Sequence, residues 1–380
     1  MPYRGQVECT SSQKDLVRTT FGSAHSDARR RGPKAIDRGK ERAAHARPAD
    51  GRASILFSSV PTFDLPLDQL QAYAPELAEP ADLDAFWADT LAETRAHDLD
   101  VRLEPVETGL VAVRTWDVTY SGFGGHRVRG WLHLPAQATG PLSAVVQYQG
   151  YGGGRGLAHE SILWAAAGYA HFIMDTRGQG SGWSTGDTPD PVGAAPAHPG
   201  SMTRGILDPA DYYYRRVFAD AVRAVEAVRG RDAVDETRVA VAGGSQGGGI
   251  SLAVAGLLPD VAATLPDVPF LCAFPRAIAI TPNDPYTEIA RYLKVHRDHE
   301  EQVLATLSYF DCATLGRRAS AAALFSVALM DETCPPSTVY AAYNAYAGPK
   351  AISVYAYNDH EGGGAFHQVA QLRWLRETLE

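Results

Sequence analysis

Residues 238–248 read RVAVAGGSQGG, an apolar run followed by a glycine-rich turn. The run Val239–Ala242 has the length and composition of a buried strand, and the residues after the turn, Gly247–Leu258, have those of a helix. Gly243-Gly244-Ser245-Gln246-Gly247 matches G-x-S-x-G, the strand-to-helix turn that presents a serine hydroxyl above the edge of a sheet. We therefore predict that Ser245 is a nucleophile.

Similar apolar runs recur on both sides of this stretch. Besides Val239–Ala242, strands are expected at Ala144–Tyr148, Ala170–Met174, Leu324–Met330 and Ile352–Tyr357. Helices are expected at Ala158–Ala167, Asp208–Gly230, Gly247–Leu258, Ser337–Ala347 and Phe366–Thr378. Short, nearly continuous apolar strands that alternate with helices indicate a mostly parallel sheet with helices on both faces. The predicted fold class is therefore α/β.

The N-terminal part of the body has a different pattern. Ordered structure is expected to begin near Phe63, with a helix from about Asp82 to His97. Two strands, Arg114–Tyr120 and His126–Leu134, are separated by a glycine-bearing connection that is typical of a hairpin. We therefore expect antiparallel strands on the N-terminal side of the central sheet.

A long loop is expected after the strand Ala170–Met174. Between Arg177 and Pro209, 12 of 33 residues are Gly or Pro. Its position after the carboxyl end of a strand favours a wall of the active site, because loops of this length are usually functional. The next helix is expected to have Asp208 as its N-cap and to end at Gly230.

A nucleophilic serine needs a base, and the base needs a group that fixes its tautomer. On this kind of sheet the chain order is Ser, then Asp or Glu, then His, each after a strand. Asp331 follows one predicted strand and His360 follows the next. We favour Asp331 as the acid and His360 as the base. His367, inside the predicted final helix, and Asp267, after a shorter apolar run, remain alternatives.

The tetrahedral intermediate of acyl transfer needs N–H donors aimed at its oxyanion. One donor should be the backbone N–H of Gln246, the residue after the nucleophile. The other should come from the glycine-rich stretch Tyr148–Gly154, where glycines let the backbone approach a substrate. A phosphate-binding loop is less favoured there, because the motif G-x-x-x-x-G-K-[ST] is absent.

Three motifs taken together resemble the acetyl xylan esterase / cephalosporin-C deacetylase family, the seventh carbohydrate esterase family. They are DTRGQG at Asp175–Gly180, GGSQGG at Gly243–Gly248 and HEGGG at His360–Gly364. Similar stretches are YYYRRVF at Tyr212–Phe218 and Asp331 with CPPST at Cys334–Thr338. The resemblance runs from about residue 63 to the C-terminus and implies an α/β-hydrolase fold.

The resemblance also implies residue roles. It gives the catalytic roles stated above to Ser245, Asp331 and His360. The backbone N–H groups of Tyr151 and Gln246 would form the oxyanion hole, and Arg177 and Gln179 would brace the loops around the site. One position departs from the family pattern, since Gly152 stands where Asn is expected.

The family removes acetyl groups from small acetylated sugars, chiefly xylo-oligosaccharides, and from cephalosporin C. It uses no metal or other cofactor, and its members are ring-shaped homohexamers whose active sites face an internal cavity. The resemblance therefore implies a small acetylated sugar or cephalosporin as the substrate, a homo-oligomer, and no metal or cofactor.

The net charge of −9 divides unevenly along the chain. Residues 1–53 hold 12 Lys/Arg and 6 Asp/Glu, a net of +6, which leaves 23 basic and 38 acidic residues, a net of −15, for the remainder. We interpret residues 1–60 as a disordered basic extension and residues 61–380 as a single esterase domain. An acidic body would repel phosphates, so nucleic acid is not the expected partner.

The cysteines and apolar stretches indicate the compartment. Four scattered cysteines show neither a disulfide framework nor zinc-ligand spacing. No apolar stretch resembles a secretory signal or a membrane span, so a cytoplasmic protein without membrane contact is expected. Alternative functions are a broader carboxylesterase, lipase or peptidase on the same fold, a catalytically inactive binding protein, and nucleic-acid binding through the basic extension.

Overall fold

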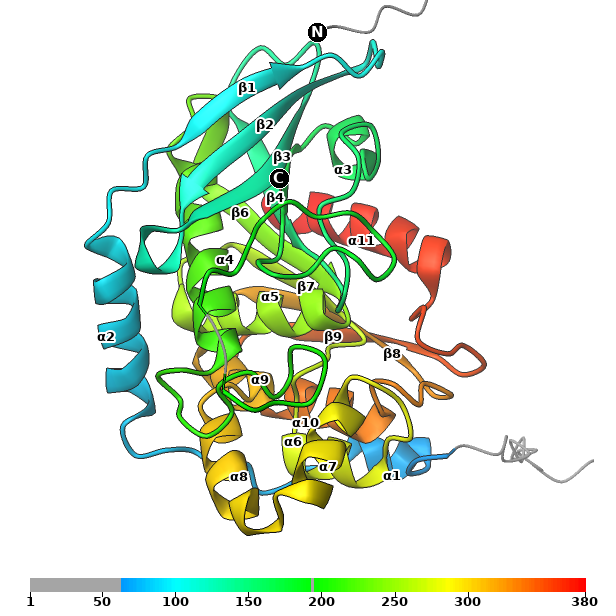
Figure 1. Cartoon of the computed structure of the whole chain (residues 1–380). Coiled ribbons are helices and arrows are strands. Elements are labelled where there is room, and N and C mark those ends of the chain that lie inside the picture. The colour runs from blue at the N-terminus through cyan, green and yellow to red at the C-terminus, as the bar shows by residue number, and fades with distance from the viewer. Residues whose placement is uncertain (1–62, 193–194) are drawn as a thin grey trace, which may run out of the picture. The chain divides into compact units, whose positions relative to one another are not determined.

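The computed structural model describes residues 63–192 and 195–380 (Figure 1). These residues belong to one compact unit, Ser58–Glu380, which is distinct from Met1–Phe57. The predicted basic extension, residues 1–60, lies outside the described residues. No helix in the described ranges is long and apolar enough to cross a membrane.

One nine-stranded sheet organises this unit, with the strand order β1-β2-β3-β5-β4-β6-β7-β8-β9. Its strands are β1 (Arg102–Val106), β2 (Val113–Ser121), β3 (Arg127–Pro135), β4 (Leu142–Tyr148), β5 (Ala170–Met174), β6 (Val234–Gly244), β7 (Ala263–Asp267), β8 (Ala322–Ala328) and β9 (Lys350–Tyr355). From β5 through β9 all neighbours are parallel, whereas β1, β2, β3 and β5 pair antiparallel. This confirms the predicted mostly parallel sheet with antiparallel strands on the N-terminal side.

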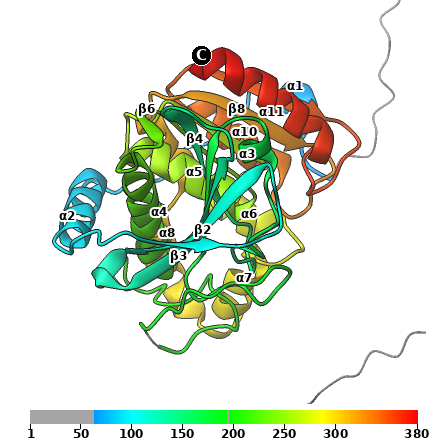
Figure 2. The same ribbon diagram turned by 90° about the horizontal axis from the view of Figure 1, so that it is seen from above.

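Helices cover both faces of the sheet (Figures 1 and 2). They are α1 (Leu67–Gln71), α2 (Leu83–Arg95), α3 (Leu163–Ala166), α4 (Tyr213–Arg229), α5 (Gln246–Leu257), α6 (Phe274–Ile280), α7 (Tyr286–Val295), α8 (Glu300–Ser308), α9 (Cys312–Leu315), α10 (Pro336–Ala345) and α11 (Gly364–Leu379). Three short 3₁₀ helices are η1 (Phe123–Gly125), η2 (Arg297–His299) and η3 (Gly316–Arg318). α3 and α11 lie on one face, and α4, α5 and α10 lie on the other.

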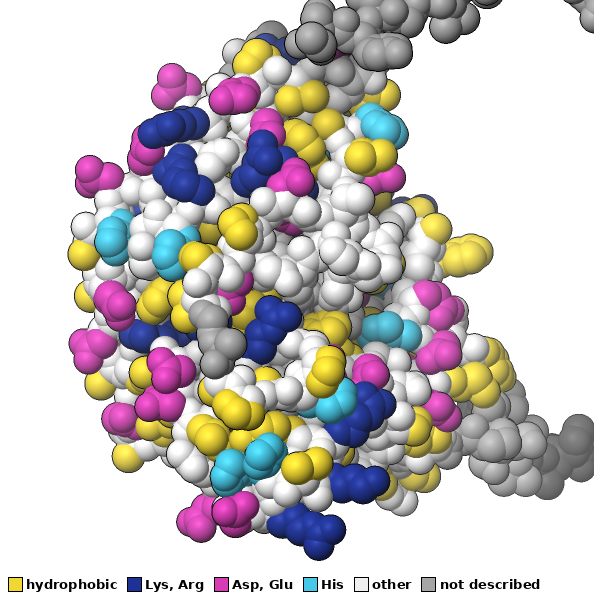
Figure 3. Space-filling model, viewed as in Figure 1, with side chains coloured by type: hydrophobic (Ala, Val, Ile, Leu, Met, Phe, Trp, Pro, Cys, Tyr) yellow, Lys and Arg dark blue, Asp and Glu magenta, His cyan; other side chains and the backbone are white. Residues whose placement is uncertain are grey.

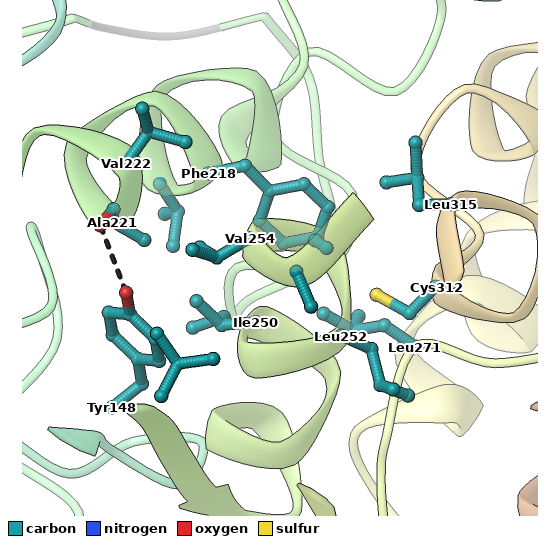
Figure 4. Close-up of a cluster of buried hydrophobic side chains, with 14 of the residues drawn as sticks. Tyr148, Phe218, Ala221, Val222, Ile250, Leu252, Val254, Leu271, Cys312 and Leu315 are labelled. Carbon is teal, nitrogen blue, oxygen red and sulfur yellow. Dashed lines mark hydrogen bonds between the residues drawn. The ribbon is translucent and has the colours of Figure 1, made fainter. Parts of the chain in front are cut away.

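Helix α5 forms the centre of the larger core. Its residues from Gln246 to Gly256 are all buried, as expected of a helix that is apolar on all sides. Figure 4 shows Phe218 of α4 packed beside Val254 of α5, and the Tyr148 hydroxyl donating a hydrogen bond to the Ala221 carbonyl at 3.0 Å. Helix α5 therefore packs against both α4 and β4.

Two predicted helices differ from the structure. The helix expected at 158–167 is reduced to Leu163–Ala166, and the helix expected to start at Asp208 begins at Tyr213. Asp208 does not cap it, because its carboxylate accepts the N–H of Ala210 at 2.8 Å within a preceding turn. A local Asx-type turn therefore competes successfully with helix initiation.

The long loop agrees with its prediction, whereas one strand and four helices were not predicted. The long connection before α4 contains no helix or strand in its described parts, 177–192 and 195–209, as predicted. Strand β1 and the helices α6, α7, α8 and α9 were not predicted, because their apolar residues show neither a long run nor a clear start signal. These four helices extend the α5 side of the molecule.

Candidate active site

Ser245 lies in the turn between β6 and α5 with φ 56° and ψ −119°. This positive φ is rare for a residue with a side chain and is the strained geometry of a nucleophile turn. The flanking glycines permit it: a Cβ at Gly247 would lie 2.2 Å from the Tyr148 carbonyl oxygen. The Ser245 N–H donates to the Asp267 carbonyl at 2.9 Å, so the end of β7 supports the turn.

Asp331 and His360 are brought together at the same edge of the sheet. Asp331 follows β8, His360 follows β9, and His360 Nδ1 lies 2.9 Å from Asp331 Oδ2. The backbone N–H groups of Thr333 and Cys334 each donate to Asp331 Oδ1 at 2.8 Å. Because Nδ1 of His360 donates its hydrogen to the Asp331 carboxylate, Nε2 carries no hydrogen and is available to accept a proton.

The environment of His360 favours its protonated form. Burial by itself would lower the pKa of this imidazole, whereas the hydrogen bond and the charge of Asp331 raise it. The carboxylates of Asp359 and Glu361 act in the same direction, so the pKa of His360 is raised above its ordinary value. The same negative charges would stabilise the imidazolium that forms when His360 takes a proton from a nucleophile.

Ser245 and His360 face one cavity of about 610 Å³. In the described part of the chain no hydrogen bond joins their side chains, and the Ser245 hydroxyl oxygen instead lies 4.0 Å from Cys334 Sγ. Such contacts are often long before substrate binds. Three glycines after Glu361 have positive φ, 59° at Gly362, 89° at Gly363 and 47° at Gly364, and they turn the chain sharply from His360 into α11.

The two alternative residues pair with each other. His367, on α11, has its Nε2 2.9 Å from Asp267 Oδ1. Gln371 of the same helix donates through Nε2 to both Asp267 oxygens at 2.9 Å. Asp267 therefore contacts α11, whereas the imidazole of His360 contacts Asp331.

Gln246 directly follows Ser245, and Tyr151 lines the same cavity as Ser245, so the backbone N–H groups of both are candidate donors. Neither group donates to a protein acceptor among the residues that the structure describes. Gln246 is the first residue of α5, where N–H groups point out of the helix and the helix dipole favours an anion. Tyr151 lines the cavity in the loop after β4. The arrangement suits two donors to an oxyanion.

The side chain and peptide of Tyr151 are fixed by contacts on several sides. Its hydroxyl donates to Glu288 Oε1 at 2.6 Å and accepts the Ser201 N–H at 2.5 Å. Trp183 Nε1 donates to the Tyr151 carbonyl at 2.9 Å. Ser201 and Trp183 belong to the long loop before α4, so one function of that loop is to hold Tyr151.

Gln179 connects the two N–H-bearing segments. Its Oε1 accepts the Gly152 N–H at 2.7 Å, and its Nε2 donates to Gln246 Oε1 at 2.9 Å. Gly152 has φ 77°, a conformation that Gly adopts freely and Asn tolerates. The departure from Asn therefore preserves the backbone path next to Tyr151.

Arg177 lies under this loop and is fully buried. Its Nε and Nη2 donate to the two oxygens of Asp220 on α4, at 2.5 and 2.7 Å. The hydroxyl of Tyr213 donates to the Arg177 carbonyl. Arg177 therefore joins the long loop to α4 and does not line the cavity.

Comparison with known proteins identifies the family. The family model described as acetyl xylan esterase (AXE1) matches residues 60–378. The chain belongs to the acetyl xylan esterase family. This membership confirms the family resemblance of the sequence motifs and makes the chain a carboxylic ester hydrolase.

Individual relatives agree with that family. The acetyl esterase Axe7A of Xylanibacter ruminicola is 25% identical over 316 residues, which cover 81% of this chain and 70% of that protein. An acetyl xylan esterase from Paenibacillus sp. R4 is 42% identical with a TM-score of 0.79, and acetyl xylan esterase 1 from Thermoanaerobacterium sp. is 32% identical with a TM-score of 0.76. Each alignment covers 83% of this chain and all of that structure.

More distant structures share only the fold. An acylaminoacyl peptidase from Pyrococcus horikoshii superposes with a TM-score of 0.51 at 13% identity, over 73% of this chain and 42% of that chain. At that identity the likeness confirms the α/β-hydrolase fold alone.

One group of potential metal ligands occurs in the described part of this esterase. The ligand atoms of Asp331, Cys334 and His360 all lie within 4.8 Å of one another. The Asp331 oxygens already accept hydrogen bonds from two backbone N–H groups and from His360. Burial raises the pKa of the Cys334 thiol well above its ordinary value, which disfavours the thiolate that binds metals. These contacts fit an acid–base pair better than a metal centre.

Sequence reasoning missed two residues of this site, Glu288 and Trp183. Glu288 is 137 positions from Tyr151 in the sequence, and no local pattern relates them. Trp183 lines the cavity from the long glycine-rich loop. A large aromatic side chain in such a loop is a sequence signal that could have indicated a functional residue.

Proposed function

We propose that this member of the acetyl xylan esterase family removes acetyl groups from small acetylated xylo-sugars through an acetyl-enzyme at Ser245. The observation that carries the proposal is that His360, paired with the buried Asp331, lines the same cavity as Ser245 in its strained turn. The chain's membership in an esterase family supports the acetyl ester as substrate.

The reaction begins with proton transfer from Ser245. His360 Nε2 accepts the hydroxyl proton as the serine oxygen attacks the acetyl carbonyl carbon. The negative oxygen of the tetrahedral intermediate accepts hydrogen bonds from the N–H groups of Tyr151 and Gln246. His360 then gives its proton to the sugar oxygen, the ester C–O bond breaks, and the deacetylated sugar leaves.

Water completes the cycle. His360 takes a proton from a water molecule that attacks the acetyl-enzyme. His360 then returns this proton to the Ser245 oxygen as the second tetrahedral intermediate collapses, which gives acetic acid and free Ser245. Asp331 remains ionised throughout and stabilises the imidazolium form of His360. The net reaction consumes one water, and the acetic acid formed ionises to acetate and releases one proton to solvent.

Replacement of Ser245 tests the nucleophile. Ser245→Ala should reduce p-nitrophenyl acetate hydrolysis at least about a thousandfold while the circular dichroism spectrum is unchanged. A fluorophosphonate probe should label the wild type at Ser245 and leave the variant unlabelled. Retained activity in the variant would refute the assignment, and an unlabelled wild type would favour a catalytically inactive binding protein.

The substrate range is tested with a second set of esters. Acetyl esters should be hydrolysed faster than octanoyl esters or a dipeptide amide, whereas preference for either of the latter would favour a lipase or peptidase. The resemblance also extends the reaction to the acetoxymethyl group of cephalosporin C.

A homohexamer and a cytoplasmic location are also part of this proposal. Sizing of the protein in solution tests the hexamer, and cell fractionation tests the location.

A further inference from the structure

Gln149 is a buried polar residue that the proposed mechanism does not use. It lines the catalytic cavity together with Ser245 and His360, and 7% of its surface is exposed. Within residues 63–192 and 195–380 its side-chain amide makes no hydrogen bond, yet neither amide atom is sealed from solvent. The small exposed part of Gln149 therefore includes the amide, and it borders the cavity.

The other buried polar side chains that line this cavity in the described part of the chain are already paired. The Tyr148 hydroxyl donates to the Ala221 carbonyl at 3.0 Å, and Nδ1 of His367 lies 3.0 Å from the Tyr355 hydroxyl. Buried polar groups in native proteins nearly always have a hydrogen-bond partner. The missing partner of Gln149 should therefore come from what enters the cavity.

The position of Gln149 in the sheet brings its side chain near the reacting ester. Gln149 directly follows β4, and Ser245 directly follows the neighbouring parallel strand β6, in which Gly243 pairs with Tyr148. Successive side chains of an extended chain point to opposite faces. Tyr148 points toward α4, so Gln149 is directed to the other face, where α11 lies (Figures 1 and 2). Neighbouring strands lie about 4.8 Å apart, so the amide can reach groups close to the ester oxygen.

The backbone of Gln149 is fixed from the nucleophile side. Its carbonyl accepts a hydrogen bond from Nε2 of Gln246, the residue after Ser245, at 3.1 Å. The side chain of Gln149 thus starts from a backbone that is tied to α5. A hydrogen bond from such a side chain costs little ordering when a substrate binds.

The ester itself limits what this amide can bind. An acetyl group has one polar atom besides the ester oxygen, the carbonyl oxygen, and the proposed donors to it are the N–H groups of Tyr151 and Gln246. Its methyl group forms no hydrogen bond, so the partner of Gln149 belongs to the alcohol part. A carboxamide both donates and accepts, so a hydroxyl or a carboxylate would suit it. An apolar alcohol would displace water from the amide without replacing its hydrogen bonds.

We propose that Gln149 is a specificity-determining residue, whose amide forms a hydrogen bond with a polar group of the alcohol close to the ester oxygen. It thereby selects polar alcohols over apolar alcohols of the same shape. This inference rests on the proposed deacetylase function and assigns to it a residue that contacts the leaving alcohol. Hydroxyl-bearing sugars and the carboxylate-bearing cephalosporin both meet the requirement.

Two acetyl esters of matched shape test the proposal. In trans-2-hydroxycyclohexyl acetate a hydroxyl stands where trans-2-methylcyclohexyl acetate has a methyl group. The readout is the ratio of kcat/KM for the hydroxy ester to kcat/KM for the methyl ester. Gln149→Met keeps the length of the side chain but removes the amide, and it should lower this ratio about tenfold. The intrinsic reactivities of the esters cancel, because each enzyme is given the same pair.

Gln69→Met is the matched control, because Gln69 is exposed on α1 and does not line the cavity. Its ratio should equal that of the wild type. Thermal melting shows whether Gln149→Met is folded. If it is not, the wild type decides, because its ratio should exceed the ratio for alkaline hydrolysis of the same two esters by at least about fivefold.

The outcomes separate this proposal from the function on which it rests. An unchanged ratio in folded Gln149→Met, including an equal loss on both esters, would overturn the role of Gln149. A wild-type ratio no higher than that of alkaline hydrolysis would overturn it as well. Failure of the wild type to hydrolyse any acetyl ester, p-nitrophenyl acetate included, would instead refute the deacetylase function.

Discussion

At His360, a hydrogen bond from the imidazole to one carboxylate controls both orientation and proton affinity. Asp331 accepts from Nδ1 at 2.9 Å and is itself completely buried, so its charge acts on the imidazole with little screening. The raised pKa of His360 means that its neutral, proton-accepting form is lost as the pH falls through that pKa. Activity should therefore decline on the acid side.

Asp331→Asn should change this pH profile. Without the negative charge the pKa of His360 falls, so the acid limb of kcat/KM moves to lower pH. The plateau rate should also fall by about 10³ to 10⁴, because the amide no longer enforces the correct tautomer. Steady-state kinetics from pH 4 to 9 with p-nitrophenyl acetate measure both effects. An acid limb that does not move would show that another group controls it.

We expect Glu288 to affect the reaction through its hydrogen bond with Tyr151. Glu288→Ala leaves the Tyr151 hydroxyl without its 2.6 Å acceptor, and the Tyr151 N–H should then lose its alignment with the oxyanion. We expect kcat to fall about tenfold to a hundredfold with KM nearly unchanged, since the lost contact acts in the transition state. Glu288→Gln, which retains an acceptor oxygen, should recover most of the rate.

Glu301→Ala provides the control for this pair, because Glu301 is exposed on α8 and no partner for it is found among the described residues. A parallel rise of KM and fall of kcat in Glu288→Ala would point to a general distortion of the site, contrary to the expected positioning role.

At the scale of elements, the close approach of α5 to β4 is possible because the residue at the contact is a glycine, Gly247. A Cβ at Gly247 would lie 2.2 Å from a backbone oxygen of β4, whereas a Cβ at Gly244, one residue before Ser245, would have no neighbour within 4 Å. Backbone atoms cannot move aside as a flexible side chain can. The approach of α5 to β4 therefore depends on Gly247.

Gly247→Ala should destabilise the protein by about 1–3 kcal/mol or more, since the added methyl overpacks a rigid contact. Gly244→Ala should change the free energy of unfolding by less than about 1 kcal/mol. Urea unfolding followed by fluorescence compares the two. Equal stability of the variants would contradict the tight contact between α5 and β4.

The buried pair of Arg177 and Asp220 joins the long loop to α4. Asp220→Ala would leave a buried guanidinium whose one remaining charged partner among the described residues is Asp190, 3.5 Å away. We expect a loss of about 3–5 kcal/mol in the free energy of unfolding. Breaking the exposed pair of Arg229 and Asp260 with Asp260→Ala should cost less than about 1 kcal/mol. If the two variants lost similar amounts of unfolding free energy, the buried Arg177–Asp220 pair would not be what holds the long loop to α4.

For the whole molecule, charge divides the chain into two parts. Residues 1–57 carry the net of +6, and residues 58–380 carry −15. On the face seen in Figure 3, acidic and basic side chains are interspersed over the described residues. A neutral acetylated sugar needs no strongly charged surface for recognition.

Removal of residues 1–57 should leave kcat/KM for p-nitrophenyl acetate within about twofold, because the proposed catalytic residues Ser245, Asp331 and His360 all lie in the unit Ser58–Glu380. Any salt-sensitive retention of nucleic acid by the full chain should disappear with the segment. The two measurements are made on the full and shortened chains at equal concentration. A large loss of esterase activity would show that the segment contributes to the enzyme.

Sequence by itself predicted most strands of the sheet, the position of the Ser245 turn and the order in which Asp331 and His360 follow it. These features are local: apolar runs, glycines with positive φ and short motifs are each set by neighbouring residues. The tertiary structure decided that His360 pairs with Asp331 and His367 with Asp267, that Glu288 holds Tyr151, and that Gln149 lines the catalytic cavity with Ser245 and His360. Those contacts join residues far apart in the chain, so their partners depend on the packing of whole elements and no local pattern specifies them.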